Sequence, residues 1–312
     1  MNRSSALLFS SLACLYPALA GLAQAQTPTP IRVGASYDED FAEGFFGKDS
    51  GLFARGGLAA DVTGLQNGGA LTAAVMSNAL DVVTTNTGSM VTAFAHNLPL
   101  VLIAPGANYS SASMTAALLV LKNSPIRSAA DLKGKSIAVT TLHTLYHTSV
   151  RNWIDKNGGD SDAAGYLELP LPTMLPALQA GRVDAIACVE PWVTQAKPFT
   201  SVLAKPYDSV ASAFMISGWV TTKPWFDANR DTVRKFVHSI AAIADWANKN
   251  PLTTAQIMAK YFSIPVETVA AMQRTRMSTD LDPALIQPVI DVLFKYKLVD
   301  RQFSAGDMVA TA

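Results

Sequence analysis

Two histidines and a Gly-Lys-Ser triplet are the residues whose spacing first suggests chemistry. His143 and His147 are four positions apart, as in a helical metal-binding pair, but the adjacent glutamate of a zinc-protease motif and a third ligand are missing. Gly134-Lys135-Ser136 matches the end of a phosphate-binding loop, yet its upstream glycine is absent and a strand-like run follows it. No Gly-x-Ser-x-Gly motif supplies a hydrolase nucleophile. The sequence therefore predicts neither a metal or cofactor site nor an enzyme.

A second set of polar and aromatic side chains follows the strand-like runs of the chain. Hydroxyl, amide and carboxylate groups can hold a small ligand by hydrogen bonds, and rings can stack on a planar group. Because ligands of open α/β sheets bind beyond the carboxyl ends of the strands, we expect these side chains to line one site. The candidate ligand-binding residues are Ser36, Tyr37, Asp38, Thr85, Asn86, Thr87, Asn108, Tyr109, Thr140, Thr141, Thr144, Glu190 and Trp192.

Each of these candidates also has a structural interpretation. The segments 36–38 and 108–109 could be polar turns, and the segment 85–89 could simply cap a helix. Glu190 could be a surface carboxylate, and Trp192 could be packed in the core. The sequence leaves both interpretations open.

The charge of the candidate loops bears on the ligand. These loops carry Asp38, Glu39, Asp40 and Glu190 but no lysine or arginine. A small anion would therefore rest on helix N-termini and hydroxyl groups alone, whereas a nitrogen-bearing ring would find acceptors. This favours a neutral or cationic planar heterocycle or aromatic compound over nitrate or a simple sulfonate.

The elements that position these residues form a βαβαβ pattern that occurs twice. The third strands align with an offset of 103 residues, which places Asp81 on Asp184, Thr87 on Glu190 and Ser89 on Trp192. Such units imply parallel strands with right-handed crossovers. The expected strands are 31–35, 60–63 and 81–84, then 136–139, 166–169 and 184–187; the expected helices are 40–55, 69–78, 144–156 and 173–180.

The remaining segments predict how the two halves connect. Strands are expected at 100–104, 116–121, 201–203 and 213–217, and a strandless helical tail from Asp227, which could cap its first helix. We expect an α/β fold, a two-lobed clamp in which each lobe is a mostly parallel sheet flanked by helices. Lobe one would comprise 26–115 and 218–312, and lobe two 116–217, with the ligand in the cleft between them.

The N-terminal 25 residues have the pattern of a secretory signal. A positive start at Arg3 precedes an apolar run and Ala23-Gln24-Ala25, which predicts cleavage after Ala25 and a periplasmic protein. A membrane anchor is the alternative, which Pro17 disfavours. Residues 26–312 then have a formal charge of −1 and a single cysteine, Cys188, which we expect to be a buried, inert thiol.

Composition excludes several classes of protein. Of the 312 residues, 49% are hydrophobic and 15% charged, and 24 basic residues balance 24 acidic ones. A disordered chain would be less apolar, and a nucleic-acid-binding chain would be basic. We expect a monomer that does not bind nucleic acid.

Several motifs resemble those of the substrate-binding proteins of ABC importers, of the nitrate/sulfonate/taurine type, a family that also includes binders of thiamine-precursor pyrimidines. The resemblance runs in order from about residue 31 to 200. Two departures are Asn78, where the family usually has glycine, and the segment 140–143, where many members have a Gly-Ser run. The matching segments are 48–53 with 57–58, 69–71, 80–82, 131–139, 178–185 and 190–192.

This resemblance implies a non-catalytic receptor that binds a small organic molecule, such as a sulfonate, an aromatic acid or a nitrogen heterocycle, and delivers it to a membrane permease. Two alternatives remain. One is an enzyme on the same fold, of the pyrimidine-synthesis or dehydratase type, and the other is a binding protein that feeds a sensor or chemoreceptor.

Overall fold

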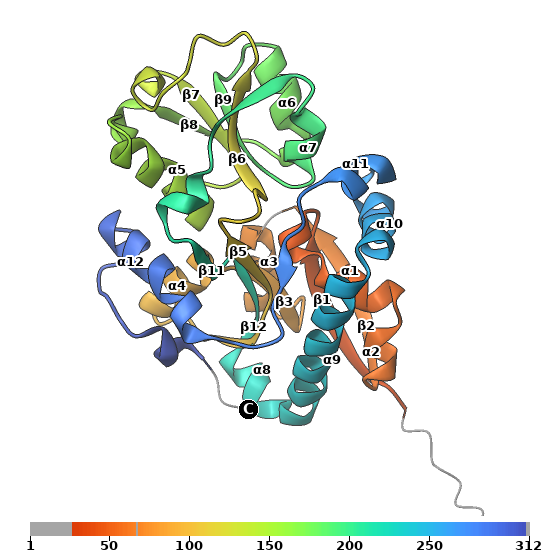
Figure 1. Ribbon diagram of the computed structural model, residues 1–312. Coiled ribbons are helices and arrows are strands. Elements are labelled where there is room, and N and C mark those ends of the chain that lie inside the picture. Colours follow the sequence, from red (N-terminus) through yellow and green to blue (C-terminus); the bar gives the residue numbers. More distant parts are fainter. Residues whose placement is uncertain (1–26, 67, 310–312) are drawn as a thin grey trace, which may run out of the picture.

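The computed structural model describes residues 27–66 and 68–309, which form two α/β bodies, one above the other in Figure 1. Each body is built on a five-stranded sheet, and we name them lobe one and lobe two. The expected signal peptide lies outside the described residues. The fold class predicted from the sequence, a two-lobed α/β clamp, is confirmed.

The sheet of lobe one has the strand order β2-β1-β3-β12-β4. β1, β2 and β3 run parallel, as the first βαβαβ unit requires, and β12 pairs antiparallel with both β3 and β4. Strands covered on both faces read as apolar runs, and Val33, Val82 and Val83 are fully buried. The strands are β1 (Thr29–Ser36), β2 (Leu58–Leu65), β3 (Val82–Asn86), β4 (Leu100–Pro105) and β12 (Ser217–Thr222).

The sheet of lobe two repeats this topology. Its order is β10-β6-β9-β7-β8, in which β7, β8 and β9 are parallel and β6 is antiparallel to both of its neighbours. When the order is read from the opposite edge, strands β7, β8 and β9 occupy the positions that β1, β2 and β3 occupy in lobe one. The strands are β6 (Ala116–Leu121), β7 (Ser136–Val139), β8 (Gly165–Glu168), β9 (Ala185–Val189) and β10 (Thr200–Ala204).

Equivalent hydrogen bonds confirm the predicted 103-residue offset. The backbone N–H of Arg32 donates to Asp81 Oδ2 at 2.8 Å, and the backbone N–H of Ser136 donates to Asp184 Oδ2 at 2.9 Å. In both lobes, an aspartate that precedes the third strand thus caps the first strand. The two sequence repeats therefore fold into structural repeats.

Three short strands form a small antiparallel sheet where the chain crosses between the lobes. Its order is β11-β5-β13, from β5 (Ala107–Ser110), β11 (Ala213–Met215) and β13 (Arg276–Met277) (Figure 1). Two expectations were wrong here. The run 213–217 is not one strand, because β11 ends at Met215 and β12 begins at Ser217, and the tail expected to lack strands contributes β13.

Helices α1 (Glu43–Asp49), α2 (Leu52–Arg55), α3 (Gly68–Met76), α4 (Thr87–Ala95) and α8 (Lys223–Ala228) belong to lobe one. The single helix expected over 40–55 is divided, because Gly51 adopts φ +72°, a left-handed conformation that a continuous helix excludes. Asp227 is not a cap: it lies inside α8, which Thr222 caps, and it pairs with Lys223 and Arg230.

The long helix α9 (Arg230–Lys249) covers the sheet of lobe one with an apolar stripe at the predicted helical spacing. Val233, Phe236, Ile240 and Ile243 on that stripe are fully buried. Burial of each such side chain contributes about 1.5–3 kcal/mol. The stripe therefore fixes where the tail attaches.

The rest of the tail reaches both lobes. Lobe two carries α5 (Leu145–Lys156), α6 (Leu171–Gln179) and α7 (Trp192–Ala196), and the tail continues with α10 (Pro251–Phe262), α11 (Val266–Ala271) and α12 (Gln287–Lys295). α11 contacts α7, and α12 contacts both α4 and α5, on the two sides of the molecule in Figure 1. Among the described residues, we find no helix with the length and apolar character needed to cross a membrane.

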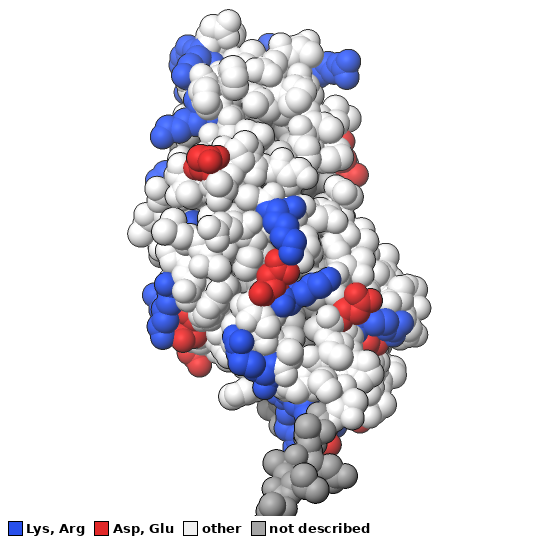
Figure 2. Space-filling model, turned by 90° about the vertical axis from the view of Figure 1, so that its right-hand side faces the viewer, with Lys and Arg blue, Asp and Glu red and all other residues white. Residues whose placement is uncertain are grey.

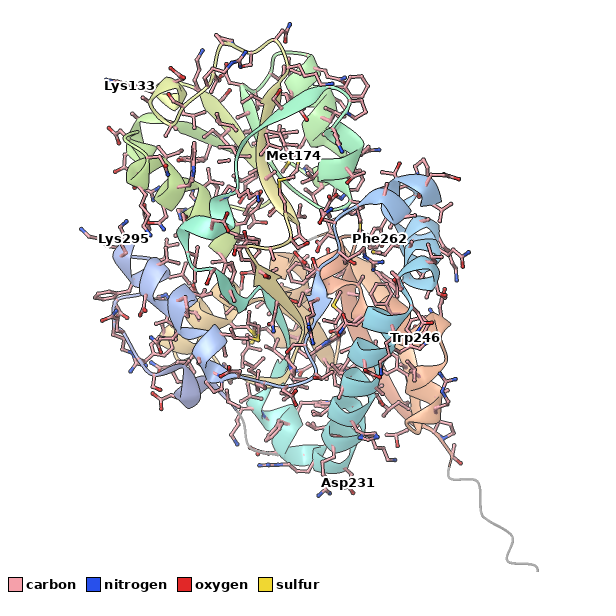
Figure 3. The ribbon with its side chains drawn as sticks, viewed as in Figure 1. Lys133, Met174, Asp231, Trp246, Phe262 and Lys295 are labelled. Atoms are coloured by element: carbon pink, nitrogen blue, oxygen red, sulfur yellow. The ribbon has the colours of Figure 1, made fainter. Side chains whose placement is uncertain are left out.

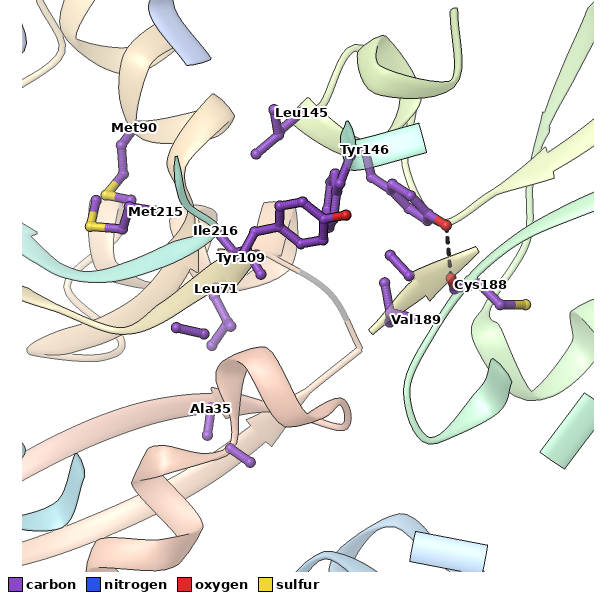
Figure 4. Close-up of a cluster of buried hydrophobic side chains, with 14 of the residues drawn as sticks. Ala35, Leu71, Met90, Tyr109, Leu145, Tyr146, Cys188, Val189, Met215 and Ile216 are labelled. Carbon is purple, nitrogen blue, oxygen red and sulfur yellow. Dashed lines mark hydrogen bonds between the residues drawn. The ribbon is translucent and has the colours of Figure 1, made fainter. Parts of the chain in front are cut away.

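Buried side chains continue from one lobe into the other along the crossing. Figure 4 shows Tyr109 and Ile216 of the crossing beside Leu145 and Tyr146 of lobe two. The Tyr146 hydroxyl is 2.7 Å from the carbonyl oxygen of Cys188. As expected from the sequence, Cys188 is a free and buried thiol. The crossing is thus part of the core rather than a loose linker.

Candidate functional site

The carboxyl ends of the parallel strands of both sheets face the space between the lobes. Four helices begin there, each after a strand: α3 and α4 in lobe one, and α5 and α6 in lobe two. Asn86 caps α4, since its side chain accepts a hydrogen bond from the Ser89 N–H at 2.8 Å. Helix N-termini present unpaired N–H groups and a partial positive charge, so this space suits polar groups of a ligand.

The first cavity in this space, which we name the inner pocket, has about 590 Å³ of empty volume including its mouth. Lobe one supplies two carboxylates and two amides, lobe two supplies hydroxyls, and the crossing supplies apolar groups. The lining residues are Asp38, Asp40, Phe41, Gln66, Gly68, Asn86, Thr140, Thr141, Thr144, Leu145, Tyr146, Leu171, Val189, Tyr207 and Ile216.

A second cavity, the outer pocket, adjoins the first, because Asp38, Gln66 and Leu171 line both. Its empty volume is also about 590 Å³, and four aromatic residues dominate its wall. Phe262 is at the end of α10. In Figure 3 it lies on the right of the molecule, whereas Lys295 of α12 lies on the left. The lining residues are Tyr37, Asp38, Gln66, Leu171, Pro172, Trp192, Tyr261 and Phe262.

Seven of the residues selected from the sequence line these two pockets. Tyr37, Asp38 and Asn86 come from lobe one, and the others come from lobe two: Thr140, Thr141, Thr144 and Trp192. They lie up to 155 positions apart in the sequence, the distance from Tyr37 to Trp192. The repeat brings them together because it places both sets of strand ends at one cleft.

The other six candidates line neither pocket. Ser36 and Thr85 are buried at the ends of their strands, where Thr85 Oγ1 lies 3.2 Å from Thr72 Oγ1. Thr87 donates to the Met215 carbonyl at 2.6 Å. Asn108 and Tyr109 belong to β5, which excludes the alternative of a polar turn, and the Tyr109 hydroxyl donates to Asp208 at 2.6 Å. The contacts of Thr87 and Tyr109 hold the crossing strands β11 and β5 in place.

Glu190 lines neither of the two pockets. Its carboxylate accepts the backbone N–H and the hydroxyl of Thr194, each at 2.9 Å, and lines a separate cavity with Gln273. Burial raises the pKa of Glu190 to about 7, although the hydrogen bonds from Thr194 lower it. A surface position is excluded, because the residue is only 3% exposed.

Sequence reasoning missed several lining residues. Gln66 follows β2 and Leu171 follows β8, so the rule that selected Asn86 could have found them. Tyr207, Tyr261 and Phe262 carry no such signal, because they lie in a 3₁₀ turn and in the tail. Only tertiary packing brings them to the cleft.

Buried carboxylates dominate the electrostatics of the pockets. Burial, reinforced by the charge of Asp40, raises the pKa of Asp38 well above its usual range. Burial also raises the pKa of Asp40 to about 7, against the hydrogen bond from Thr275. Among the described residues, neither pocket wall contains lysine, arginine or histidine.

Glu39, between the lining residues Asp38 and Asp40, pairs with Arg274, although burial raises its pKa. Glu39 is 1% exposed, and it accepts the backbone N–H of Thr275 at 2.8 Å. This links the loop after β1 to the segment that leads into β13. Glu39 is therefore occupied by the protein itself and is not free to contact a ligand.

The two histidines are joined by a hydrogen bond at the start of α5. The His143 backbone N–H donates to His147 Nδ1 at 3.0 Å, and burial lowers the pKa of His147 to about 4. In the part of the chain that the structure describes, no group of three or more potential ligands is arranged around a metal position.

Comparison with known proteins places this geometry in a family. The model described as NMT1/THI5 like matches residues 38–254. A protein of Brachyspira hyodysenteriae, named as an ABC transporter periplasmic binding protein, is 24% identical over 143 residues, which are 43% of this chain and 38% of that protein. The match thus spans well under half of that relative.

Two solved structures share the fold. One is the alkanesulfonate-binding protein SsuA from Xanthomonas axonopodis pv. citri bound to MOPS, with 17% identity, a TM-score of 0.76 and coverage of 91% of this chain and 99% of that one. The other is the periplasmic nitrate-binding protein NrtA from Synechocystis PCC 6803, with 14% identity, a TM-score of 0.73 and coverage of 89% and 84%.

These likenesses confirm the resemblance seen in the sequence motifs. The family match covers more than half of the chain and includes both halves of the cleft. The chain therefore belongs to the NMT1/THI5-like family.

Proposed function

We propose that this protein is a periplasmic solute receptor that binds a small organic molecule between its lobes and delivers it to the permease of an ABC importer. The observation that carries the proposal is the inner pocket, whose wall combines side chains from both lobes with the crossing. A ligand that contacts both lobes stabilises their closed arrangement, and a permease can recognise that arrangement. The names of the relatives and the signal-like N-terminus support export to the periplasm.

The lobe boundaries follow from this proposal. We place lobe one at 26–115 and 218–312, and lobe two at 116–217, and expect the protein to work as a monomer. The crossing strands β5 and β11 would act as the hinge. Cleavage after Ala25 would release the mature chain.

The pocket chemistry favours a neutral or cationic ligand that carries nitrogen. Asp38 Oδ1 is buried and has no hydrogen-bond partner among the described residues. A ligand N–H or ammonium group at this position would satisfy that oxygen, whereas a carboxylate or sulfonate would meet an acidic wall without a basic side chain. Thr140, Thr141, Thr144 and Asn86 can complete the contacts to the rest of a polar ring.

A thermal-melt screen of residues 26–312 tests this function. The panel contains aminopyrimidines and aminopyridines, aromatic carboxylates, sulfonates, taurine and nitrate. A ligand at 100 times its Kd stabilises the folded state by about 2.7 kcal/mol, which raises Tm by several degrees. We expect a nitrogen heterocycle to give the shift and to be recovered unchanged by mass spectrometry. Turnover of the bound compound would instead favour an enzyme, and a response to anions alone would contradict the proposed ligand class.

Asp38→Asn is the matching variant, because it keeps the shape and replaces one carboxyl oxygen by an amide group. We expect at least a tenfold weaker affinity for the compound found in the screen. Asp61→Asn is the control, since it makes the same substitution at an exposed position on β2. Equal affinity of both variants would remove Asp38 from the site.

A further inference from the structure

The outer pocket differs in chemistry from the inner one. Its lobe-one wall is formed by the rings of Tyr37, Tyr261 and Phe262, and its lobe-two wall by Leu171, Pro172 and Trp192. Its polar groups are the hydroxyls of Tyr37 and Tyr261, the side chains of Asp38 and Gln66 at the junction with the inner pocket, and the indole N–H of Trp192.

The aromatic wall is held rigidly. The rings of Tyr37 and Phe262 meet edge to face with centroids 6.2 Å apart, and Phe45 behind them stacks on Tyr261 at 4.2 Å. Such pairs fix the ring planes. The wall is thus arranged before any ligand arrives.

The hydroxyl groups of this wall already have partners within lobe one. The Tyr37 hydroxyl donates to the Gly64 carbonyl at 3.2 Å, and the Tyr261 hydroxyl donates to Asp49 at 2.8 Å. Their hydrogen-bonding capacity as donors is therefore used away from the pocket. What remains for a ligand on this side is ring surface.

Trp192 supplies the unused polar group on the opposite side. The residue is 7% exposed, and its Nε1 is buried without a hydrogen-bond partner among the described residues. An indole nitrogen can only donate, and a buried donor normally has an acceptor. A ligand acceptor atom in the outer pocket would complete this bond.

From these observations we propose that the outer pocket is a second subsite, which takes a flat ring that carries an acceptor atom, a ring nitrogen or oxygen, directed at Trp192. Because Asp38, Gln66 and Leu171 line both cavities, one molecule can extend through both. The ligand would then have two parts: a nitrogen-bearing group in the inner pocket and this ring in the outer one. This inference rests on the proposed receptor function.

Quinoline is a suitable probe, because it is a flat ring with one acceptor nitrogen and can occupy the subsite alone. The experiment titrates ¹⁵N-labelled protein with quinoline and follows the indole N–H signals by NMR; the signal missing from the Trp192→Phe variant belongs to Trp192. We expect this signal to move downfield in saturable fashion, and the affinity to fall at least tenfold in Trp192→Phe. Trp246→Phe, on α9 and labelled in Figure 3, is the control that keeps wild-type affinity.

A second variant keeps the reporter signal. Tyr261→Leu removes part of the aromatic wall but leaves Trp192 in place, so quinoline should still shift the Trp192 signal with a severalfold higher Kd. An unmoved Trp192 signal at about 1 mM quinoline, where a specific ring site should be occupied, would overturn the subsite. Equal affinity in wild type and Trp192→Phe would overturn it as well.

The two proposals fail in different ways. If a single-ring compound from the melt screen stabilises the protein while quinoline leaves Trp192 unaffected, the receptor function stands and the second subsite does not. If quinoline binds at Trp192 but every panel compound is turned over, the subsite stands and the receptor function does not.

Discussion

Gly88 of α4 and Leu145 of α5 face each other across the cleft at the N-termini of their helices. A Cβ atom placed on Gly88 would lie 2.8 Å from the backbone nitrogen of Leu145, closer than real Cβ atoms approach such an atom. One residue belongs to lobe one and the other to lobe two. The described arrangement of the lobes therefore requires a residue without a side chain at position 88.

This contact predicts that Gly88→Ala keeps the lobes slightly apart. Ligand affinity, measured by calorimetry with the compound found in the screen, should fall at least tenfold. The unliganded variant should stay folded, because alanine is a better helix former than glycine. Gly165→Ala is the control, since a Cβ there meets its nearest neighbour, the Lys135 carbonyl oxygen, at 3.7 Å. Wild-type affinity of Gly88→Ala would show that binding does not need this approach.

The Arg274–Glu39 pair predicts a large loss of stability when one partner is removed. Arg274→Met leaves the buried Glu39 carboxylate without its cation, and breaking a buried pair in this way costs about 3–5 kcal/mol. The free energy of unfolding, measured with urea, should fall accordingly. Arg234→Met removes an exposed pair with Asp231 and should leave that free energy unchanged within error. Similar values for both variants would contradict the role of burial.

Because Glu43 is buried, we expect the free energy of unfolding to depend on pH. Burial raises the pKa of Glu43 to about 8 from an ordinary 4.5, and the Trp219 N–H, which donates at 2.8 Å, lowers it only in part. The folded state thus keeps a proton that the unfolded state releases. The stabilisation is complete below about pH 4.5 and is lost as the pH rises through about 8.

Glu43→Gln should remove this part of the pH dependence, because glutamine does not titrate. Relative to wild type, the variant should gain stability between pH 5 and pH 8, by several kcal/mol at about 1.4 kcal/mol per pH unit. Urea unfolding at both pH values measures the difference. Parallel profiles for the two proteins would mean that Glu43 is ionised in the folded state.

We expect Tyr296, at the end of α12, to slow the release of the ligand. The Tyr296 hydroxyl donates to Asp155 of α5, and Arg151 of α5 lies 4.9 Å from the centre of the Tyr296 ring, so α12 bridges to lobe two. Tyr296→Phe should raise the ligand dissociation rate about two- to tenfold, since one partly exposed hydrogen bond contributes about 0.5–1.5 kcal/mol. Stopped-flow measurements give this rate. Gln302→Ala, whose bond to Asp291 stays within the tail, should dissociate as wild type does.

The face of the protein shown in Figure 2 carries both signs of charge, which does not favour steering of a charged ligand toward it. Figure 2 shows basic and acidic side chains interspersed over the face formed by the right-hand side of Figure 1. Mixed charge gives no field of one sign. The walls of the two pockets, by contrast, carry the carboxylates of Asp38 and Asp40 and, among the described residues, no basic side chain.

The amino-acid sequence by itself determined the repeat, the strand ends and the class of fold. Apolar runs such as that around Val33 report burial of a strand on both faces, and the stripe through Phe236 reports a helix packed on one side. Both signals are local, because they depend on the periodicity of neighbouring residues. The same signals, followed by polar residues, placed Asp38, Asn86 and Thr144 at the cleft.

Only the tertiary structure decided which side chains face the ligand space and which are used elsewhere. Glu190 directly follows β9 and Asn86 ends β3, yet Glu190 accepts its hydrogen bonds from Thr194. Tyr261 and Phe262 reach the outer pocket from a tail more than 200 residues beyond Tyr37. The physical reason is that periodicity records whether a residue is buried, whereas the partner it meets depends on packing between elements that are distant along the chain.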